Sequence, residues 1–379
     1  MSMVYINKTA KFLPNNPISN DEMEDYLGLI NNVKSKSKNI VLRSNKIKNR
    51  YYAIDKDGNS THSNAKLVSL AINNLESTDH NLKDVDLLVC GTSTPDQLIP
   101  SHAIMVHGEV PFLGPVEVVS PSGVCCSGMH ALKYAYLSIK SGDKKKAITS
   151  GSEKISKLLR SENYQEEIQR LGELEQNPYI AFEKDFLRWM LSDGAGVFLI
   201  EDKPNTNGLS LRIDWIEGVS FANVQDPCMY MGCEKLEDGT LRSYMDMSSN
   251  EIAEQSIFSV KQDVKQLAEN IVPLGFIKLK ELLEVKGFDI SEIDYFLPHL
   301  SSYFFEQKIF DYLEEKNMGV PKEKWFTNLS SVGNVGSGSI YLMIDALFNS
   351  ENLKKGQTIL VLVPESARFS YSYCHLTVC

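Results

Sequence analysis

Two adjacent cysteines, Cys125 and Cys126, stand in a turn of small residues directly before an apolar stretch. Apolar residues recur at helical spacing from residue 129 to residue 139, and Gly142 follows where a helix commonly ends. Both cysteines are therefore predicted at the N-terminus of a helix, where unpaired N–H groups and the helix dipole favour an anion. A thiolate is such an anion, so we expect a lowered thiol pKa and a nucleophilic sulfur. The alternative is a pair of small buried core residues, as most free cysteines are.

The second half of the chain supplies two side chains that suit the same chemistry. His299 follows a short apolar run at 293–297, and Asn334 stands in the glycine-rich sequence SVGNVGSGS. A thiolate could attack an acyl thioester and hold the acyl group. The imidazole Nε2 and the carboxamide could then donate hydrogen bonds to the carbonyl oxygen of a second thioester. Each residue alone also has a structural explanation, since asparagine tolerates a left-handed backbone and a single histidine often serves the core.

Two pairs of segments resemble each other across the chain. DVDLLVCGTS in the first half matches EIDYFLPHLS in the second, and the predicted helix that starts near Ser127 matches one that starts near Ser337. We interpret this as a duplicated βα unit in an α/β protein, with halves at 1–203 and 204–379. The two helix N-termini should then lie side by side at a pseudo-twofold axis. A site built there would draw residues from both halves.

Length, charge and cysteine usage argue against several classes of protein. The chain has 379 residues, a net charge of -10 and a pI of about 5.3, which disfavours non-specific nucleic-acid binding. It contains no apolar run of the ~18 residues that a membrane span needs, and its N-terminus lacks a signal-peptide pattern. Seven cysteines at irregular spacing suit a reducing cytoplasm. Cys228 and Cys233 have no second Cys or His pair nearby, so we expect no metal site.

Taken together, the motifs resemble those of the β-ketoacyl-ACP synthase III family of the thiolase superfamily along nearly the whole chain. CCSG at 125–128 is similar to the family's nucleophile motif Ala-Cys-Ser/Ala-Gly, which identifies Cys126 as the acylated cysteine and Cys125 as a small core residue. LPH is similar to the family's Pro-His and gives His299, while GNVGSGS is similar to its Gly-Asn-x-x-x-x-Ser turn and gives Asn334. Three further matches are SDGAG at 192–196, TSTPD followed by Pro100, Ser101 and Ala103, and IKNR at 47–50.

The resemblance implies a five-layered αβαβα thiolase fold, a homodimer and no permanently bound cofactor. It implies acyl transfer from acyl-CoA or acyl-ACP to Cys126, followed by a Claisen condensation that His299 and Asn334 serve. The backbone N–H groups of Cys126 and Ala367 are the implied oxyanion hole, because Ala367 stands where the family has a glycine-rich turn. An acyl carrier protein is an implied partner. The basic run at 144–146 is either a docking point for such an acidic carrier or a solvated turn.

The chain also departs from the family pattern. After His299 the family has Gln-Ala-Asn-x-Arg, whereas this chain has LSSYF, and the turn at 364–369 reads PESARF. Extra sequence stands at 155–180 and at 220–255. These departures suit a specialised synthase of secondary metabolism better than fatty-acid initiation. The pattern resembles the condensing enzymes of dialkylresorcinol pathways, which join two acyl or β-ketoacyl thioesters.

Other functions fit part of the same pattern. An acyltransferase that passes the acyl group to oxygen or nitrogen would share the acyl-enzyme step. The order Cys, His, Asn also occurs in papain-like hydrolases, but those carry a Trp soon after the nucleophile, and Met129 follows Gly128 here. A non-catalytic partner would have no reason to retain Cys126, His299 and Asn334 together.

Overall fold

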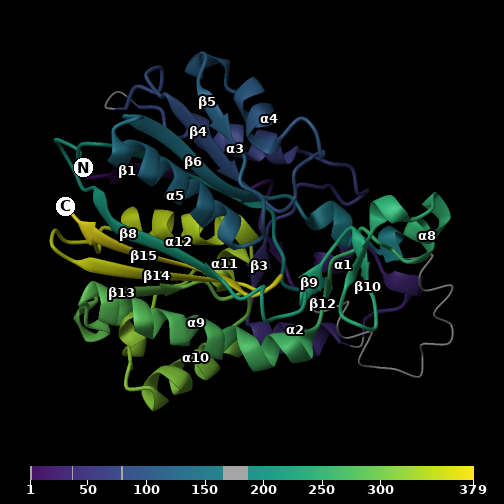
Figure 1. Ribbon diagram of the computed structural model, residues 1–379. Helices are drawn as coiled ribbons and strands as arrows, with labels where there is room; N and C mark the ends of the chain where they lie inside the picture. The colour runs from purple at the N-terminus through teal and green to yellow at the C-terminus, as the bar shows by residue number, and fades with distance from the viewer. Residues whose placement is uncertain (1, 36, 78–79, 165–186) are drawn as a thin grey trace.

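A single nine-stranded sheet runs through the computed structural model, which describes residues 2–35, 37–77, 80–164 and 187–379 (Figure 1). The strand order is β5-β4-β6-β7-β1-β8-β15-β14-β13. The first part of the chain provides β1 (Tyr5–Phe12), β4 (Leu87–Gly91), β5 (Glu117–Val119), β6 (Lys146–Glu153) and β7 (Gly194–Glu201). The second part provides β8 (Leu211–Ser220), β13 (Tyr295–Pro298), β14 (Thr358–Glu365) and β15 (Ser370–Val378).

Helices and short strands make up the remaining regular structure. The helices are α1 (Met23–Leu27), α2 (Lys38–Asn45), α3 (Asn64–Asn73), α4 (His102–Gly108), α5 (Cys126–Ser141), α8 (Ser249–Glu254), α9 (Val264–Lys286), α10 (Phe304–Glu315), α11 (Leu329–Val332) and α12 (Ser339–Phe348). The short strands pair with one another outside the large sheet and are β2 (Ile18–Ser19), β3 (Asn49–Arg50), β9 (Met229–Tyr230), β10 (Cys233–Lys235), β11 (Leu241–Ser243) and β12 (Lys261–Gln262). Within the described ranges, no helix is long and apolar enough to cross a membrane.

Helices and the two halves of the sheet alternate in five layers (Figure 1). Helices α3 and α4 cover the outer face of the half-sheet that contains β4, β6 and β7, and α5 and α12 lie between the two half-sheets. Helices α9 and α10 cover the outer face of the half-sheet that contains β13, β14 and β15. The predicted αβαβα thiolase fold is confirmed. The half-sheets join through a short antiparallel pairing of β1 with β8, at Tyr5 with Arg212 and Ile6 with Leu211.

The central helix α5 follows the apolar pattern of the sequence. Its residues Met129, Leu132, Ala135 and Ile139 are buried against the sheet on both sides, and Gly142 ends the helix in a left-handed conformation. Burial of one such side chain contributes roughly 1.5–3 kcal/mol. Because α5 carries the two cysteines at its start, this packing fixes their place between the half-sheets.

The N-termini of α5 and α12 meet at backbone distance, as the duplicated pattern predicts. A Cβ on Gly128 would stand 2.5 Å from the Ser337 carbonyl oxygen, and one on Gly151 would collide with the same atom. The Tyr341 hydroxyl donates to the Gly128 carbonyl oxygen at 2.9 Å, and the Ser337 hydroxyl donates to the Ser152 carbonyl oxygen at 2.9 Å. Only glycine allows helices and strand to approach this closely.

The boundary between residues 203 and 204 stays a prediction. The strands of one half-sheet end by Glu201, and those of the other begin at Leu211, which is consistent with it. Of the extra sequence at 155–180, residues 165–180 lie outside the described residues. The extra sequence at 220–255 contains β9, β10, β11 and α8, which form a small module at one end of the molecule (Figure 1).

The substitution Gly151→Ala should lower the free energy of unfolding by about 1–3 kcal/mol, because the new methyl group would press on the Ser337 backbone. Chemical denaturation measures the loss. The matched control is Gly108→Ala at the end of α4, where an added Cβ meets no atom within 4 Å. Equal stabilities of the two variants would contradict the close approach of the halves.

Candidate active site

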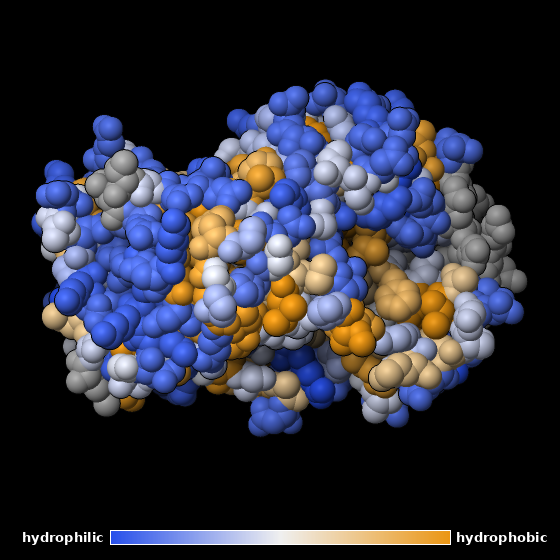
Figure 2. All heavy atoms as spheres, turned by 90° about the horizontal axis from the view of Figure 1, so that it is seen from above, coloured by the Kyte–Doolittle hydropathy of each residue, from blue (hydrophilic) through white to orange (hydrophobic). Residues whose placement is uncertain are grey.

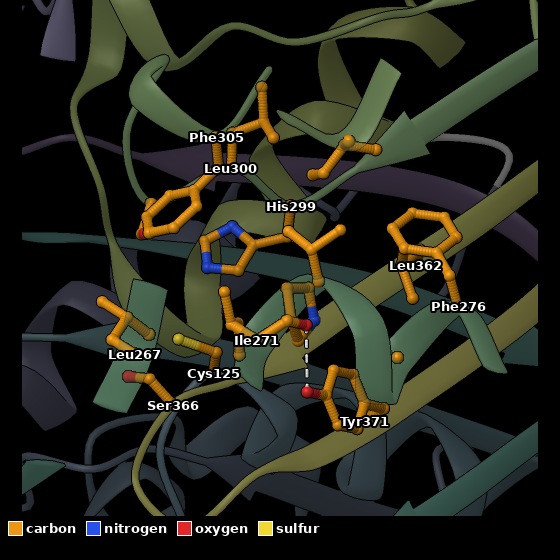
Figure 3. A pocket seen from close by; sticks show the side chains of 15 residues that line it. Cys125, Leu267, Ile271, Phe276, His299, Leu300, Phe305, Leu362, Ser366 and Tyr371 are labelled. Atoms are coloured by element: carbon orange, nitrogen blue, oxygen red, sulfur yellow. Dashed lines mark hydrogen bonds between the residues drawn. The ribbon is translucent and has the colours of Figure 1, made fainter. Parts of the chain in front are cut away.

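Two cavities meet at Cys125, between the N-terminus of α5 and the second half of the chain. The first is lined by Cys125, His299 and mostly apolar side chains of α9 and α10 (Figure 3). The second is lined by Cys125, Asn334, Glu153, several serines and apolar residues. Cys125, Ser301 and Ser366 line both cavities. His299 and Asn334 therefore each line a cavity with Cys125, whereas the predicted convergence was with Cys126, which lines neither cavity.

The cysteine that faces these cavities is Cys125, whereas the sequence motif identified Cys126. Cys125 is the N-cap residue of α5 and is 8% exposed, while Cys126 begins the helix and is 0% exposed. The Cys126 thiol donates to the Val363 carbonyl oxygen at 3.3 Å, on the β14 side. Successive helical residues point about 100° apart, so a shift of one position moves the sulfur from the cavity into the core.

His299 is held at the end of β13 with its imidazole directed toward Cys125 (Figure 3). Its backbone N–H donates to the Leu362 carbonyl oxygen at 2.8 Å, which continues the parallel pairing of β13 with β14. The side chain is buried, and among the described residues its Nε2 has no hydrogen-bond partner. Burial lowers the pKa of His299 to about 4. At neutral pH the ring is uncharged, with one nitrogen that donates and one that accepts.

Asn334 lines the second cavity. Its side-chain oxygen accepts from the Gly336 N–H at 2.9 Å and lies 3.4 Å from the Ser339 hydroxyl. A backbone N–H requires an acceptor, so this contact fixes the oxygen and turns the NH2 group away from the turn. The Asn334 backbone pairs with Met190 and Ser192, which anchors the turn to the first half of the chain.

Glu153 is a site residue that the sequence analysis missed. It ends β6, is buried, and lines the second cavity beside Asn334. Its carboxylate accepts from the Ser93 hydroxyl at 2.8 Å, the Thr94 hydroxyl at 2.6 Å and the Ser337 N–H at 3.2 Å. Burial nevertheless raises its pKa. The sequence does contain one feature that could have identified Glu153, because it is a single acidic residue directly after a run of small and uncharged residues, AITSGS.

Residues of the other motifs hold the loops around this site. Asp193 of SDGAG is buried and accepts from the N–H groups of Ala53, Ile155 and Ser156 at 2.6 to 2.9 Å. Arg50 of IKNR is buried and donates to Asn20 at 2.7 Å. In the described part of the chain, no group of three or more His, Cys, Asp or Glu side chains could hold a metal ion.

Comparisons with known proteins point to one family of condensing enzymes. The family model for the C-terminal part of 3-oxoacyl-[acyl-carrier-protein] synthase III matches residues 283–364. The β-ketoacyl-[acyl-carrier-protein] synthase III of Clostridium perfringens is 25% identical over 358 residues, which are 93% of this chain and 92% of the relative. That of Neisseria gonorrhoeae is 24% identical over 363 residues, 95% of each chain.

The chain is therefore similar to the β-ketoacyl-ACP synthase III family along nearly its whole length. A tetronic acid condensing enzyme shares its fold with a TM-score of 0.77 at 19% identity and 99% coverage of both chains. The 3-oxoacyl-[acyl-carrier-protein] synthase III of Aquifex aeolicus shares the fold with a TM-score of 0.69 at 19% identity. Xanthomonas campestris OleA with bound lauric acid and lauroyl-CoA shares it with a TM-score of 0.73 at 16% identity. Each of these two matches covers 99% of both chains. The protein is a condensing enzyme of the ketosynthase III kind.

The synthase departs from the predicted oxyanion hole. The Cys126 N–H donates to Oε2 of Glu365 at 2.9 Å, and the Val124 N–H donates to the same oxygen at 2.9 Å. Ala367 is not among the residues that line either cavity, and its carbonyl oxygen accepts from the Cys228 N–H at 2.8 Å. Within the turn, Ser366 lines both cavities.

The expectation of a lowered cysteine pKa is wrong for the resting synthase. Burial raises the pKa of the Cys125 thiol well above its usual value, and the charges of Glu365 and Glu153 raise it further. Cys126 is shifted in the same direction, by burial and by Glu365. The predicted anion at the helix N-terminus was a cysteine thiolate, whereas the N–H groups of Val124 and Cys126 donate to the carboxylate of Glu365.

The stability of the synthase should fall in weak acid because of His299. Its folded-state pKa of about 4 lies below the ordinary value of 6.5, so the unfolded chain binds the proton more readily between these pH values. Stability therefore decreases as pH falls through this window. From pH 7 to pH 5 the wild type should lose about 2 kcal/mol more than His299→Gln does, by urea denaturation at each pH. The same pH dependence in both proteins would contradict a buried neutral imidazole.

Proposed function

We propose that the protein condenses two acyl thioesters and holds the first acyl group on Cys125. The observation that carries this proposal is that two mostly apolar cavities meet at one sulfur, with His299 beside one and Asn334 beside the other. An acyl chain on Cys125 could occupy one cavity while a second chain enters the other. A product that joins two chains in this way suits the dialkylresorcinol type of synthase.

The first step transfers the acyl group from CoA or a carrier protein. The Cys125 sulfur attacks the thioester carbonyl carbon, and its proton passes to the neutral imidazole of His299. When the carbon–sulfur bond of the donor breaks, the departing thiolate takes up that proton. Because burial and neighbouring carboxylates keep the resting Cys125 protonated, a base at this position is needed for attack.

The second step forms the carbon–carbon bond. The α-carbon of the second thioester loses either a carboxyl group as CO2 or a proton, which the Glu153 carboxylate at the second cavity accepts. The electron pair of the broken bond forms a carbanion next to the carbonyl group, and negative charge develops on the carbonyl oxygen. An imidazole N–H of His299 and the NH2 group of Asn334 donate to that oxygen, and loss of one such donor typically costs about 10²–10³ in rate. The carbanion attacks the acyl carbon on Cys125, and the carbon–sulfur bond breaks. The Cys125 thiolate then takes a proton from Glu153 if the α-carbon lost a proton, or from water if it lost CO2.

The walls of both cavities suit alkyl chains. In the first cavity, Leu267, Ile271 and Phe276 come from α9, and Phe305 and Ile309 come from α10. In the second cavity, the apolar wall consists of Ile155, Leu187, Leu191, Met229 and Val260. OleA, which shares the fold, was solved with lauric acid and lauroyl-CoA, and both carry a long alkyl chain.

Part of the second wall belongs to the extra sequence that begins near residue 220. Met229 comes from β9, which pairs with β12 beside Val260. The module that contains β9 also exposes Met231, Met245 and Phe258. Figure 2 shows hydrophobic residues around a hollow at the end of the molecule where α8 and β10 lie in Figure 1. We assign to this module the shaping of the second acyl site.

The partners follow from the same proposal. CoA or an acyl carrier protein delivers the acyl groups, and the seven cysteines form no disulfide, which suits a cytoplasmic enzyme. We also infer a homodimer. The edge strand β5 ends the sheet, and nearby segments expose Leu98, Ile99, Ile104 and Met105. A second copy would cover both the strand edge and these side chains.

Acylation of the two single-cysteine variants decides which sulfur is the nucleophile. Intact-mass spectrometry after mixing with acyl-CoA should show the acyl mass on wild type and on Cys126→Ala, and should show none on Cys125→Ala. The opposite pattern would restore the assignment from the sequence motif. The variants His299→Ala and Asn334→Ala should condense about 10²–10³ times more slowly, and Asn334→Ala should still be acylated.

Chain-length selection tests the assignment of the two cavities. The substitution Ile309→Phe narrows the first cavity and Val260→Phe narrows the second, so each should shorten a different chain of the product. The measurement is mass spectrometry of products from paired acyl and β-ketoacyl thioesters of graded length. Matched controls are Val285→Phe on α9 and Val224→Phe, since both valines are exposed. If both cavity variants shortened the same chain of the product, the proposal of two separate acyl sites would be contradicted. If the products instead carried the acyl group on an oxygen or nitrogen atom, the acyltransferase alternative would be supported.

A further inference from the structure

A carboxylate from the second half of the chain caps the helix that carries the cysteines of the first half. Glu365 is the last residue of β14 and is 7% exposed. Its Oε2 accepts from the N–H groups of Val124 and Cys126, at 2.9 Å in each case, on both sides of Cys125 in the sequence. Two N–H groups that converge on one oxygen form an anion site at the N-terminus of α5.

The same strand also fixes the other residues of the active site. The Leu362 carbonyl oxygen accepts from the His299 N–H at 2.8 Å, and the Val363 carbonyl oxygen accepts from the Cys126 thiol at 3.3 Å. Glu365 therefore cannot shift as part of β14 without moving His299. Gly123 lies beside the carboxylate, since a Cβ added there would stand 3.5 Å from Oε2 of Glu365.

A negatively charged oxygen at the reacting carbon would compete with Glu365 for these N–H groups. Oxyanion donors act at about 2.7–3.1 Å, which is the distance at which the carboxylate now sits. Two anions so close together in a buried site repel each other strongly. Glu365 must therefore leave these donors before they can stabilise a tetrahedral intermediate.

We propose that Glu365 is a positioning residue that occupies the anion site of α5, holds the resting Cys125 as a thiol, and yields the site to the incoming acyl thioester. The proposal rests on the assignment of Cys125 as the acylated residue. The anionic substrate group is the thioester oxygen as it gains charge. The Cys125 thiol would then become a reactive thiolate only when an acyl donor is bound. This would limit side reactions of the cysteine in the free enzyme.

Other titratable groups around Cys125 contribute to its reactivity and define the controls. Glu153 faces it across the second cavity, His299 faces it across the first, and Cys126 is its neighbour on α5. Burial is the largest cause of the raised Cys125 pKa, followed by Glu365 and then Glu153. The charge of Glu365 also reaches His130 on α5. Changing Glu365 alone therefore tests one identified contribution.

The first experiment measures alkylation of Cys125 by iodoacetamide from pH 6 to pH 10, with the modified residue identified by peptide mass spectrometry. Glu365→Gln keeps an oxygen acceptor for the two N–H groups but removes the charge. Its rate should rise about tenfold at pH 7, with the profile displaced about one pH unit downward. Glu365→Asp keeps the charge and should react as slowly as wild type. The exposed Glu109→Gln is the matched control and should leave the profile unchanged.

A wild-type alkylation profile in a folded Glu365→Gln variant would overturn the proposal, and so would fast alkylation of Glu365→Asp.

The second experiment compares the rate of acylation from acyl-CoA. Glu365→Gln should be acylated faster than wild type, since a neutral amide competes less with the oxyanion. Slower acylation would show that the carboxylate assists the transfer, and would overturn its displacement. The alkylation experiment needs no acyl donor, so it tests the effect of Glu365 on Cys125 by itself. Its result stays valid even if no acyl-enzyme forms and the proposed condensing function is wrong.

Discussion

The close backbone contact between the N-termini of α5 and α12 sets the geometry of everything around it. Gly128 and Gly151 leave room for the Ser337 carbonyl oxygen, and Tyr341 and Ser337 secure the contact with hydrogen bonds. This contact joins the two halves of the chain where each begins a buried helix. Without it, the cysteine turn of the first half and the glycine-rich turn of Asn334 in the second could not line one cavity.

Much of this arrangement could be predicted from the sequence, because it follows from patterns that repeat. The duplicated segments predict two equivalent helices, and the apolar spacing after Gly128 predicts which face of α5 is buried. Once the halves are superposed in this way, His299 and Asn334 have to lie near the cysteines. The motifs that resemble the synthase III family point to the same fold, and the five layers confirm it.

Two kinds of feature could not be predicted from the sequence: those that depend on the exact residue at which a helix begins, and those that depend on contacts between residues far apart in the chain. Cys125 and Cys126 are adjacent residues of the same type, and only the exact start of α5 decides that Cys125 lines the cavities. Ala367 was chosen by its place in a turn, yet the irregular path after β14 places Ser366 at both cavities instead. The role of Glu365 required knowing that a side chain 240 residues away in the chain reaches Val124 and Cys126. Such contacts have no local signal in the sequence.

The site is notable for its lack of free charge at rest. The buried thiol and imidazole are neutral at pH 7 because burial shifts their pKa values apart, upward for Cys125 and downward for His299. Two carboxylates, Glu153 and Glu365, are instead held by N–H and hydroxyl donors of the loops around them. The sulfur and the thioester oxygen therefore gain charge only as a thioester reacts, and the donors of the two halves have to be in place beforehand.

The most direct test of this account is a crystal structure of the protein after reaction with an acyl-CoA. We predict electron density that continues from the Cys125 sulfur into one of the two cavities, with His299 and Asn334 directed toward the site where the second thioester would react. An acyl group on Cys126, or one bound away from both His299 and Asn334, would contradict the claim that the two halves build a single active site around Cys125.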